Sequence, residues 1–355
     1  MPSGRMIAGH DNRGPVKGGT LVNLALIGTG AWGRNLLRNF AHLKGAHLRV
    51  CCDLDGEQCE TTLNEFRGIR LETDPEAVMS DPDIDAVAIA TPAVTHFELA
   101  MRAIKAGKDV FVEKPMTLTY ENAVELVEAA DAAKRILMVG HLLEYHGAVA
   151  KMKELLDAGE LGNPYYLYSE RLNLGRIRSD ENALWSLAPH DISIILHLLD
   201  EEPIDVAARG AAYIRPGIED VVFLWMRFPG NRLAHIHVSW LDPHKVRRTT
   251  MVGSKRMVVF DDMQAAEKIR IYDKGVDPNG RYVGYTESLS IRSGDVLVPA
   301  LHMGEPLKLE CEHFVECVAN RTTPRSDGRD GMRVVRVLDA AQRSLKSGGL
   351  PVTLE

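Results

Sequence analysis

Between residues 21 and 141 the sequence alternates short apolar runs with longer segments of helical spacing, and this rhythm is what most constrains the fold. The apolar runs are LVNLALIG, LRVCCD, DAVAIAT, DVFVEK and RILMVGH. Strands that alternate with helices at this spacing predict parallel β-α-β units. Because the runs are almost entirely apolar, they suit strands of a sheet that is covered on both faces. The sequence therefore predicts an α/β domain with a doubly wound parallel sheet.

The first strand of this domain runs directly into the segment GTGAWG, residues 28–33, which matches G-x-G-x-x-G and opens a helical pattern. In such a motif Gly28 allows a tight turn, Gly30 lets the backbone approach a pyrophosphate, and Gly33 lets the helix pack closely on the strand. A loop that simply needs glycines would match as well. The strand before the motif and the helix after it favour dinucleotide binding at the helix N-terminus.

Asp53 ends the second predicted strand, twenty positions after Gly33. A carboxylate at this place accepts hydrogen bonds from the ribose hydroxyls of the adenosine and repels a 2′-phosphate. No Arg or Lys stands directly beside it. The sequence therefore predicts NAD rather than NADP as the cofactor.

The carboxyl ends of parallel strands form the ligand crevice of an open α/β sheet, so Thr91, Pro92, Glu113 and Lys114 are expected near the nicotinamide. Lys114 either caps its strand as a solvated charge or stabilises an alkoxide. Glu113 either orients that ammonium or contributes through its backbone, and His96 either contacts the cofactor or caps a helix. The candidate cofactor-binding residues are Gly28, Thr29, Gly30, Ala31, Trp32, Gly33, Asp53, Thr91, Pro92, His96, Glu113 and Lys114.

From residue 142 the rhythm changes to a helix, a strand, a further helix predicted to begin near Pro189, and then alternating strands such as DVVFLWMRF and LAHIHVSWL. This pattern predicts an α+β domain, residues 142–355, with an open, mostly antiparallel sheet and helices on one face. The other face carries apolar side chains at alternate positions. We expect this domain to bind substrate and to form a homodimer or homotetramer.

At this point the chain resembles a known family. Glu113–Lys114–Pro115 at the end of the fifth strand, followed by an open-sheet domain, resembles the glucose-fructose oxidoreductase, inositol dehydrogenase and rhizopine-catabolism family over residues 21–355. The resemblance implies that Lys114 is catalytic or positions substrate, and that the family's catalytic histidine is His190. Ser186 stands where the family usually has an aspartate, so an Asp-assisted proton relay is in doubt.

Residues 171–193 resemble the corresponding stretch of UDP-N-acetylglucosamine 3-dehydrogenases. The arginines suit phosphate and the asparagines suit sugar hydroxyls or an acetamido group, although a solvated or subunit-facing basic patch would look the same. The residues Tyr145 and His146 are alternative candidates for substrate contact near the crevice. The candidate substrate-binding residues are Lys114, Tyr145, Arg171, Asn173, Arg176, Arg178, Asn182, Trp185 and His190.

Composition excludes several other classes. The net charge of −7 argues against a nucleic acid or an anionic membrane as the main partner, and no apolar run is long enough to span a bilayer. Residues 1–20 lack the apolar core of a secretory signal and are expected to be a disordered leader. Five cysteines without metal-like spacing favour a reducing cytoplasm, and no metal site is expected at the pair His235 and His237 or along one face of the helix around residues 308–320.

The leading hypothesis is NAD-dependent oxidation of the 3-hydroxyl of a UDP-N-acetylglucosamine-type sugar, with His190 as general base and Lys114 stabilising the alkoxide. The resemblance implies a downstream aminotransferase as a functional partner. Two alternatives are a cyclitol or free-sugar dehydrogenase, in which the arginines serve structure, and a cofactor-bound regulator without catalysis.

Overall fold

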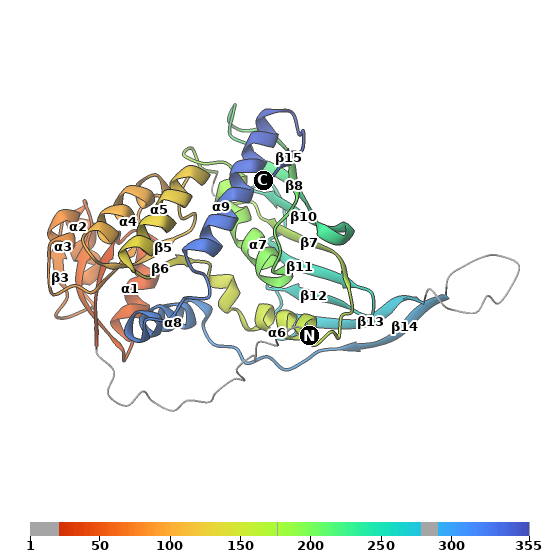
Figure 1. Cartoon of the computed structure of the whole chain (residues 1–355), viewed down its shortest axis with the longest axis horizontal. Helices are drawn as coiled ribbons and strands as arrows, with labels where there is room; N and C mark the ends of the chain where they lie inside the picture. The colour runs from red at the N-terminus through yellow and green to blue at the C-terminus, as the bar shows by residue number, and fades with distance from the viewer. Residues whose placement is uncertain (1–20, 176, 278–289, 355) are drawn as a thin grey trace, which may run out of the picture.

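The computed structural model describes residues 21–175, 177–277 and 290–354. Within these residues the chain forms two sheets, one of six strands and one of nine. Figure 1 shows them side by side, with the N-terminal α/β part on the left and the large C-terminal sheet on the right. The residues of the predicted leader, 1–20, lie outside the described part. None of the helices in the described part combines the length and apolar character that a membrane crossing requires.

The N-terminal sheet is entirely parallel and has the strand order β3-β2-β1-β4-β5-β6. This is the order of a Rossmann fold, and it confirms the predicted doubly wound sheet. Its strands are β1 (Val22–Ile27), β2 (Ala46–Cys52), β3 (Arg70–Glu72), β4 (Ala86–Ile89), β5 (Asp109–Glu113) and β6 (Leu137–Gly140). Its helices are α1 (Gly33–Ala41), α2 (Gly56–Leu63), α3 (Pro75–Met79), α4 (His96–Lys105) and α5 (Tyr120–Ala133).

The C-terminal sheet has the strand order β14-β13-β12-β11-β7-β10-β9-β8-β15. Its neighbours are antiparallel except for β7 and β10, which confirms the predicted open, mostly antiparallel sheet. The strands are β7 (Pro164–Leu172), β8 (Asp205–Ala211), β9 (Val221–Phe228), β10 (Arg232–Ser239), β11 (Val246–Gly253), β12 (Met257–Asp261), β13 (Ile269–Asp277), β14 (Ser290–Leu297) and β15 (Val352–Thr353).

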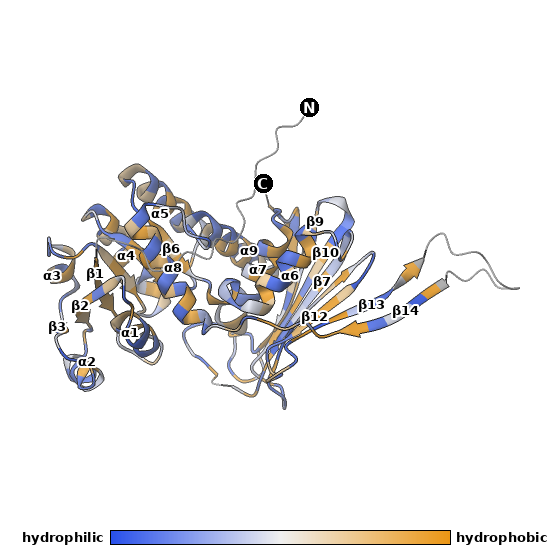
Figure 2. Ribbon diagram, turned by 90° about the horizontal axis from the view of Figure 1, so that it is seen from below, coloured by the Kyte–Doolittle hydropathy of each residue, from blue (hydrophilic) through white to orange (hydrophobic). Residues whose placement is uncertain are grey.

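Helices α6 (Gly147–Asp157), α7 (Ala183–Leu199) and α9 (Gly328–Lys346) cover one face of this sheet, as Figure 2 shows. A short 3-10 helix, η2 (Leu142–Tyr145), connects β6 to α6. Apolar side chains of α7 and α9 pack with those of the sheet into one buried cluster. The strands β13 and β14 extend beyond this helical layer as a two-stranded arm (Figure 2).

Helix α7 begins at Ala183, and Pro189 lies inside it, so the prediction that this helix begins near Pro189 is wrong. The physical reason is Asn182, which adopts an extended conformation and whose side chain accepts a hydrogen bond from the N–H of Trp185. A side-chain cap of this kind satisfies one of the orphan donors of the first turn. The sequence signal was therefore an N-cap asparagine rather than the proline.

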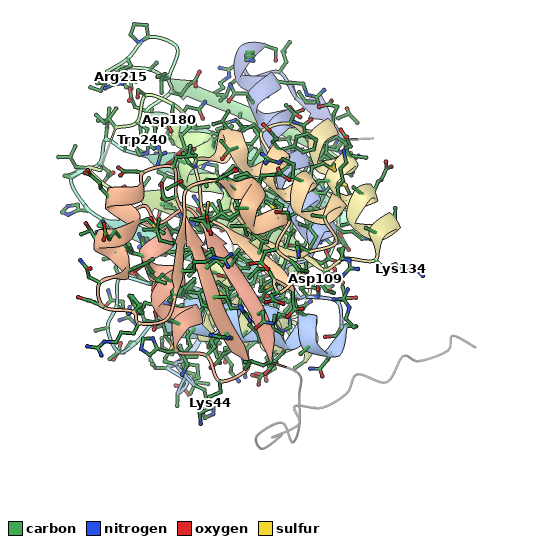
Figure 3. The ribbon with its side chains drawn as sticks, turned by 90° about the vertical axis from the view of Figure 1, so that its left-hand side faces the viewer. Lys44, Asp109, Lys134, Asp180, Arg215 and Trp240 are labelled. Carbon is green, nitrogen blue, oxygen red and sulfur yellow. The ribbon has the colours of Figure 1, made fainter. Side chains whose placement is uncertain are left out.

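Helix α8 (Pro306–Asn320) returns from the C-terminal part of the chain and packs on the Rossmann domain, beside α1 in Figure 1. Its residues Leu307, Cys311 and Phe314 belong to one buried cluster with Phe40 of α1 and Phe111 of β5. Just beyond the helix, Arg321 binds the carboxylate of Asp109 and the carbonyl oxygen of Lys134. Both partners are labelled in Figure 3, on the Rossmann side of the molecule.

Glu310 of α8 is completely buried in this contact, and neither carboxylate oxygen has a hydrogen-bond partner among the described residues. Burial, together with the nearby carboxylate of Glu113, raises the pKa of Glu310 well above its ordinary value. The side chain is therefore part of the protein interior, in agreement with the prediction that this helix face makes core contacts.

We expect Glu310→Gln to change the free energy of unfolding more favourably at alkaline pH than at pH 5. Because folding raises the pKa, the folded state keeps a proton that the unfolded chain loses, so stability is lost as pH rises toward the folded pKa. Glutamine cannot ionise and escapes this loss. Thermal melts from pH 5 to 9, with the partly exposed Glu312→Gln on the same helix as control, would measure the difference. Parallel curves for Glu310→Gln and the wild type would contradict the expectation.

Candidate active site

The glycine loop between β1 and α1 has the three geometries that the motif requires. Gly28 has φ +96°, and a Cβ there would lie 2.7 Å from the backbone of Ala90. A Cβ on Gly33 would lie 2.0 Å from the carbonyl oxygen of Gly28, so only glycine allows this approach of helix and turn. A Cβ on Gly30 would meet no atom within 4 Å, which leaves the loop surface open at the place where a pyrophosphate approaches. The loop therefore fits a dinucleotide.

Asp53 follows β2 and is held against the same loop. Its Oδ2 accepts hydrogen bonds from the backbone N–H of Thr29 at 2.6 Å and from the Thr29 hydroxyl at 2.9 Å. Its Oδ1 accepts from the N–H of Asp55 at 3.1 Å. A carboxylate has about four lone-pair positions, so it retains acceptors for a ribose diol. Asp53 thus has the place and the capacity that the sequence assigned to it.

We expect Asp53→Ala to weaken the binding of NAD far more than that of NADP, because only NAD offers a free 2′-hydroxyl to this carboxylate. The variant also removes the support of Thr29, but that loss affects both cofactors equally, so the ratio of the two dissociation constants is the informative quantity. Fluorescence titration of each cofactor measures it. Asp55→Ala is the matched control, because Asp55 caps α2 through Gln58. Equal weakening of both cofactors by Asp53→Ala would contradict the ribose assignment.

Glu113, the last residue of β5, is buried and links the strand to the glycine loop. Its carboxylate accepts hydrogen bonds from the indole N–H of Trp32, at the start of α1, and from the N–H of Lys114 at 3.2 Å. It also lies over Gly140 of β6, where a Cβ would come within 2.9 Å of Oε2. Burial raises the pKa of Glu113 to about 7, although Trp32 and Lys114 oppose the shift. The side chain therefore holds Trp32 as well as the Lys114 corner.

Lys114 reaches from the Rossmann domain to the first turns of α7. Its Nζ donates a hydrogen bond to the carbonyl oxygen of Ser186 at 3.1 Å. Burial lowers the pKa of Lys114, and the charges of Arg171 and Arg178 lower it further, whereas Glu113 and Glu181 oppose the shift. Ser186, at the position where the family usually has aspartate, thus contributes a backbone carbonyl to the site.

His190 lies one helical turn after Ser186, and its Nδ1 is buried without a hydrogen-bond partner among the described residues. Burial lowers the pKa of His190 well below its ordinary value, and the charge of Lys114 adds to this effect. An imidazole with such a pKa is neutral at physiological pH and can accept a proton. The structure therefore brings together the two residues that the sequence assigned to catalysis.

His141 is a third member of this cluster, and the sequence analysis gave it no role. It follows β6, and the register of Glu113 with Gly140 places it next to Lys114 at the same edge of the sheet. Both ring nitrogens are buried without a partner among the described residues. Burial, then the charge of Lys114, lowers the pKa of His141 to about 3. Its position directly after a predicted strand was the signal that pointed to it.

A cleft of about 510 Å³ opens beside this cluster. Its walls come from both parts of the chain, because Trp32 belongs to the Rossmann domain and Arg171, Asn173 and His190 to the C-terminal one. His146, the alternative to Tyr145, also lines the cleft. Lys245, Arg247 and Lys268, which the sequence analysis did not single out, complete a basic wall.

Tyr145, Asn182 and Trp185 make hydrogen bonds within the protein, and their contact with substrate stays a prediction. The hydroxyl of Tyr145 lies 3.2 Å from that of Ser326, and its ring is buried in the cluster beneath α8. Asn182 caps α7 and donates to Gln342 at 3.0 Å, as does the indole N–H of Trp185 at 3.0 Å. None of the three is among the side chains that line the cleft.

The arginines that the sequence assigned to phosphate have carboxylate partners where they are described. Arg171 is buried in an ion pair with Asp191, with Nε 2.6 Å from Oδ2. Arg178 pairs with Glu181 at 2.8 Å and with Asp180, which is labelled in Figure 3. Arg176 lies outside the described residues. Arg171 and Arg178 thus already have carboxylate partners within the chain, and their role as phosphate ligands stays a prediction.

His96, the first residue of α4, links two loops at the edge of the Rossmann sheet. Its Nδ1 lies 2.8 Å from the carbonyl oxygen of Pro115 and its Nε2 lies 2.9 Å from that of Thr91. The hydroxyl of Thr91 lies 2.7 Å from that of Thr95. This buried side chain therefore joins the Thr91–Pro92 loop to the Lys114–Pro115 corner. The described residues contain no group of three or more His, Cys, Asp or Glu side chains suited to a metal ion.

Comparison with known proteins agrees with this geometry. Residues 22–141 match the NAD-binding Rossmann fold of an oxidoreductase family, and residues 149–259 match the GFO/IDH/MocA C-terminal domain. The chain is 28% identical over 316 residues to UDP-N-acetylglucosamine 3-dehydrogenase of Acidithiobacillus ferrooxidans, covering 88% of this chain and 94% of that protein. It is 27% identical over 349 residues to scyllo-inositol 2-dehydrogenase (NAD(+)) of Bacillus subtilis, covering 94% and 96%.

Among solved structures, UDP-N-acetylglucosamine 3-dehydrogenase GnnA from A. ferrooxidans matches with a TM-score of 0.77 and 27% identity, over 93% of this chain and 99% of that chain. GenD2 from gentamicin A biosynthesis, in complex with NAD, shares the fold with a TM-score of 0.79 at 22% identity, over 96% and 100% of the two chains. The fold and the site thus define an oxidoreductase that binds NAD. The chain belongs to the GFO/IDH/MocA oxidoreductase family.

Proposed function

We propose that the protein oxidises the 3-hydroxyl of a UDP-N-acetylglucosamine-type nucleotide sugar to the 3-keto sugar, with NAD as the hydride acceptor. The observation that supports this most is the Lys114–His190 pair beside a cleft whose far wall carries Lys245, Arg247 and Lys268. Such a cleft suits an alcohol attached to an anionic group. The similarity to a UDP-N-acetylglucosamine 3-dehydrogenase along nearly the whole chain supports the same substrate class.

In this proposal the side chains of the chain handle the proton and the developing charge. Neutral His190 accepts the proton of the 3-hydroxyl as the C–O bond becomes a carbonyl. The ammonium of Lys114 stabilises the negative charge that develops on that oxygen. NAD, bound along the glycine loop and Asp53, supplies the acceptor for the hydride that leaves C3. The product is a keto sugar nucleotide, which is the kind of substrate that an aminotransferase converts to an amino sugar.

A cyclitol dehydrogenase is the second candidate, because scyllo-inositol 2-dehydrogenase of B. subtilis is similar over almost the same length. A cofactor-bound regulator is the third, suggested by Ser186 in place of the usual aspartate. NAD reduction, followed by absorbance with UDP-N-acetylglucosamine, myo-inositol and glucose in parallel, separates the three. Turnover of the nucleotide sugar alone supports the proposal, turnover of inositol overturns it in favour of the second candidate, and no turnover with any substrate favours the third.

We also propose that the open face of the large sheet is the interface of a homo-oligomer. On this face His235 and His237 lie at alternate positions of β10, and the ring of His237 stacks on that of Phe223 with the two centroids 4.2 Å apart. Trp225 and Tyr166 lie on the same sheet and are 46% and 44% exposed. A second copy would cover this aromatic surface.

We expect Trp225→Glu to shift the protein from dimer or tetramer toward monomer, because a carboxylate buried in an apolar interface has no partner. Light scattering coupled to gel filtration measures the mass. Leu350→Glu, at a residue that is 65% exposed near the end of the chain, is the control. A wild-type monomer, or an unchanged oligomer of Trp225→Glu, would overturn the proposed interface.

A further inference from the structure

The cleft carries more positive charge than its carboxylates neutralise. Four cationic side chains line it, namely Arg171, Lys245, Arg247 and Lys268, against the single lining carboxylate of Asp262. Arg171 is neutralised from below by Asp191, a buried ion pair that also receives the hydroxyl of Ser169. Two positive charges therefore remain without a carboxylate in the described cleft.

Asp262 is shared among three neighbours on one side of the cleft. Lys268 Nζ lies 2.9 Å from its Oδ1, His146 Nε2 lies 3.6 Å from the same oxygen, and Arg247 Nη1 lies 3.7 Å from Oδ2. The short contact to Lys268 is the strong one, because hydrogen bonds weaken beyond about 3.2 Å. Asp262 thus belongs mainly to Lys268, which leaves the guanidinium of Arg247 available.

Arg247 and Lys245 point their charge toward the reaction site because of the sheet register. Arg247 of β11 lies directly opposite Arg171 of β7 in an antiparallel pair, so the two side chains share the face that packs on α7. Asp191, the partner of Arg171, is the residue next to His190. Lys245 immediately precedes β11, is exposed, and makes no hydrogen bond or ion pair with any described residue. These two cations therefore stand one strand farther out than the Arg171–Asp191 pair.

We propose that Lys245 and Arg247 bind the diphosphate of a nucleoside-diphosphate sugar whose reacting hydroxyl lies between Lys114 and His190. The proposal rests on the function proposed above and deepens it. An arginine fork pairs with two phosphate oxygens at once, and a lysine adds a compact charge, so the pair matches the two negative charges of a diphosphate. In this proposal Arg171 lines the cleft and balances the charge of Asp191, and it does not bind the phosphate.

This subsite makes the basic end of the cleft the element that selects between substrate classes. A neutral cyclitol would leave Lys245 and Arg247 without partners, and it would gain nothing from the positive potential. A nucleotide sugar satisfies both and is oriented by them, because its sugar ring must then extend toward α7. The specificity therefore depends on the segment DPHKVRR before and within β11.

Steady-state kinetics of Lys245→Met and Arg247→Gln test the assignment. Each variant is expected to raise the KM for UDP-N-acetylglucosamine about 10- to 100-fold, the range expected when a charged hydrogen bond is lost, with a smaller change in kcat. Arg256→Gln is the matched control, because Arg256 lies in the turn between β11 and β12, is partly exposed, and pairs with Glu160 away from the cleft. A raised KM in Arg178→Gln combined with an unchanged KM in both test variants would overturn the proposal.

Calorimetric binding of UDP to the NADH-saturated protein tests the subsite without turnover, since NADH blocks the nucleotide site of the Rossmann domain. The wild type should bind UDP, and both variants should bind it at least tenfold more weakly. If no nucleotide sugar is oxidised but this pattern holds, the proposed function fails and the subsite stands. If nucleotide sugars are oxidised but UDP binds all variants equally, the subsite fails and the function stands. Calorimetric binding of glucuronate without any binding of UDP would assign the cations to a carboxylate and overturn the diphosphate assignment.

Discussion

Replacing Lys114 with methionine is expected to lower the rate of hydride transfer roughly 10²- to 10³-fold, the scale seen when one preorganised stabiliser of an oxyanion is removed. Methionine keeps most of the bulk of the side chain but loses the charge and the hydrogen bond to Ser186. Affinity for NAD should change little, because the glycine loop and Asp53 remain intact. Stopped-flow absorbance at saturating sugar nucleotide measures the rate, and quenching of Trp32 fluorescence measures cofactor binding.

Lys105→Met is the control for this experiment. It makes the same lysine-to-methionine replacement at an exposed residue, the last one of α4. Lys114→Arg adds a second comparison, since it preserves the charge with a different shape and should recover part of the rate. If Lys114→Met transfers hydride as fast as the wild type, Lys114 merely closes β5 and the catalytic assignment is wrong.

Replacing His190 with asparagine is expected to lower kcat/KM by about 10²- to 10⁴-fold, the range for loss of a positioned general base. The pH profile gives a sharper test. A base must be unprotonated, so the rate falls only when pH drops below the pKa of His190, which burial and Lys114 hold well below the ordinary value of 6.5. The wild type should therefore keep its kcat/KM to a lower pH than a base with the ordinary pKa of 6.5 would allow.

The acidic limb of the wild-type profile should be absent in His190→Asn. His197→Asn is the matched control, because His197 lies on the same helix and faces Glu144 at 3.8 Å, outside the cleft. Its own pKa is lowered to about 4, mainly by burial, so a general effect of buried histidines on folding would appear in this control as well. A limb centred near pH 6.5, or an identical limb in His190→Asn, would show that another group is the base.

The features that the sequence predicted correctly are those fixed by local patterns. Alternating strands and helices predict the parallel sheet, because each apolar run must be buried on both faces. The glycines of residues 28–33 are each demanded by a backbone contact that any Cβ would disturb. Lys114 was predicted at the crevice because strand ends in a parallel sheet meet at one edge, and the structure places it against Ser186 there.

The features that the sequence could not predict depend on partners far away along the chain. Asn182 and Trp185 share the side chain of Gln342, about 160 and 157 residues away, and no local pattern indicates such a contact. The buried ion pair of Arg171 with Asp191 was not predicted either, because the packing of α7 on β7 brings the two residues together. Lys245 and Arg247 were overlooked because charges before an antiparallel strand are common on solvated surfaces. Only the register with β7 directs them toward the cleft.

The return of α8 to the N-terminal domain has a consequence for how such chains can be divided and recombined. The segment that matches the family's Rossmann model ends at residue 141, yet Phe40 and Phe111 find part of their cover in Phe314, and α1 is tied to Glu305 through Arg38. A fragment that ends at 141 would expose this apolar patch to water. To transfer the cofactor specificity of a relative to this chain, two separate segments therefore have to be exchanged together. They are residues 22–141 and residues 305–321.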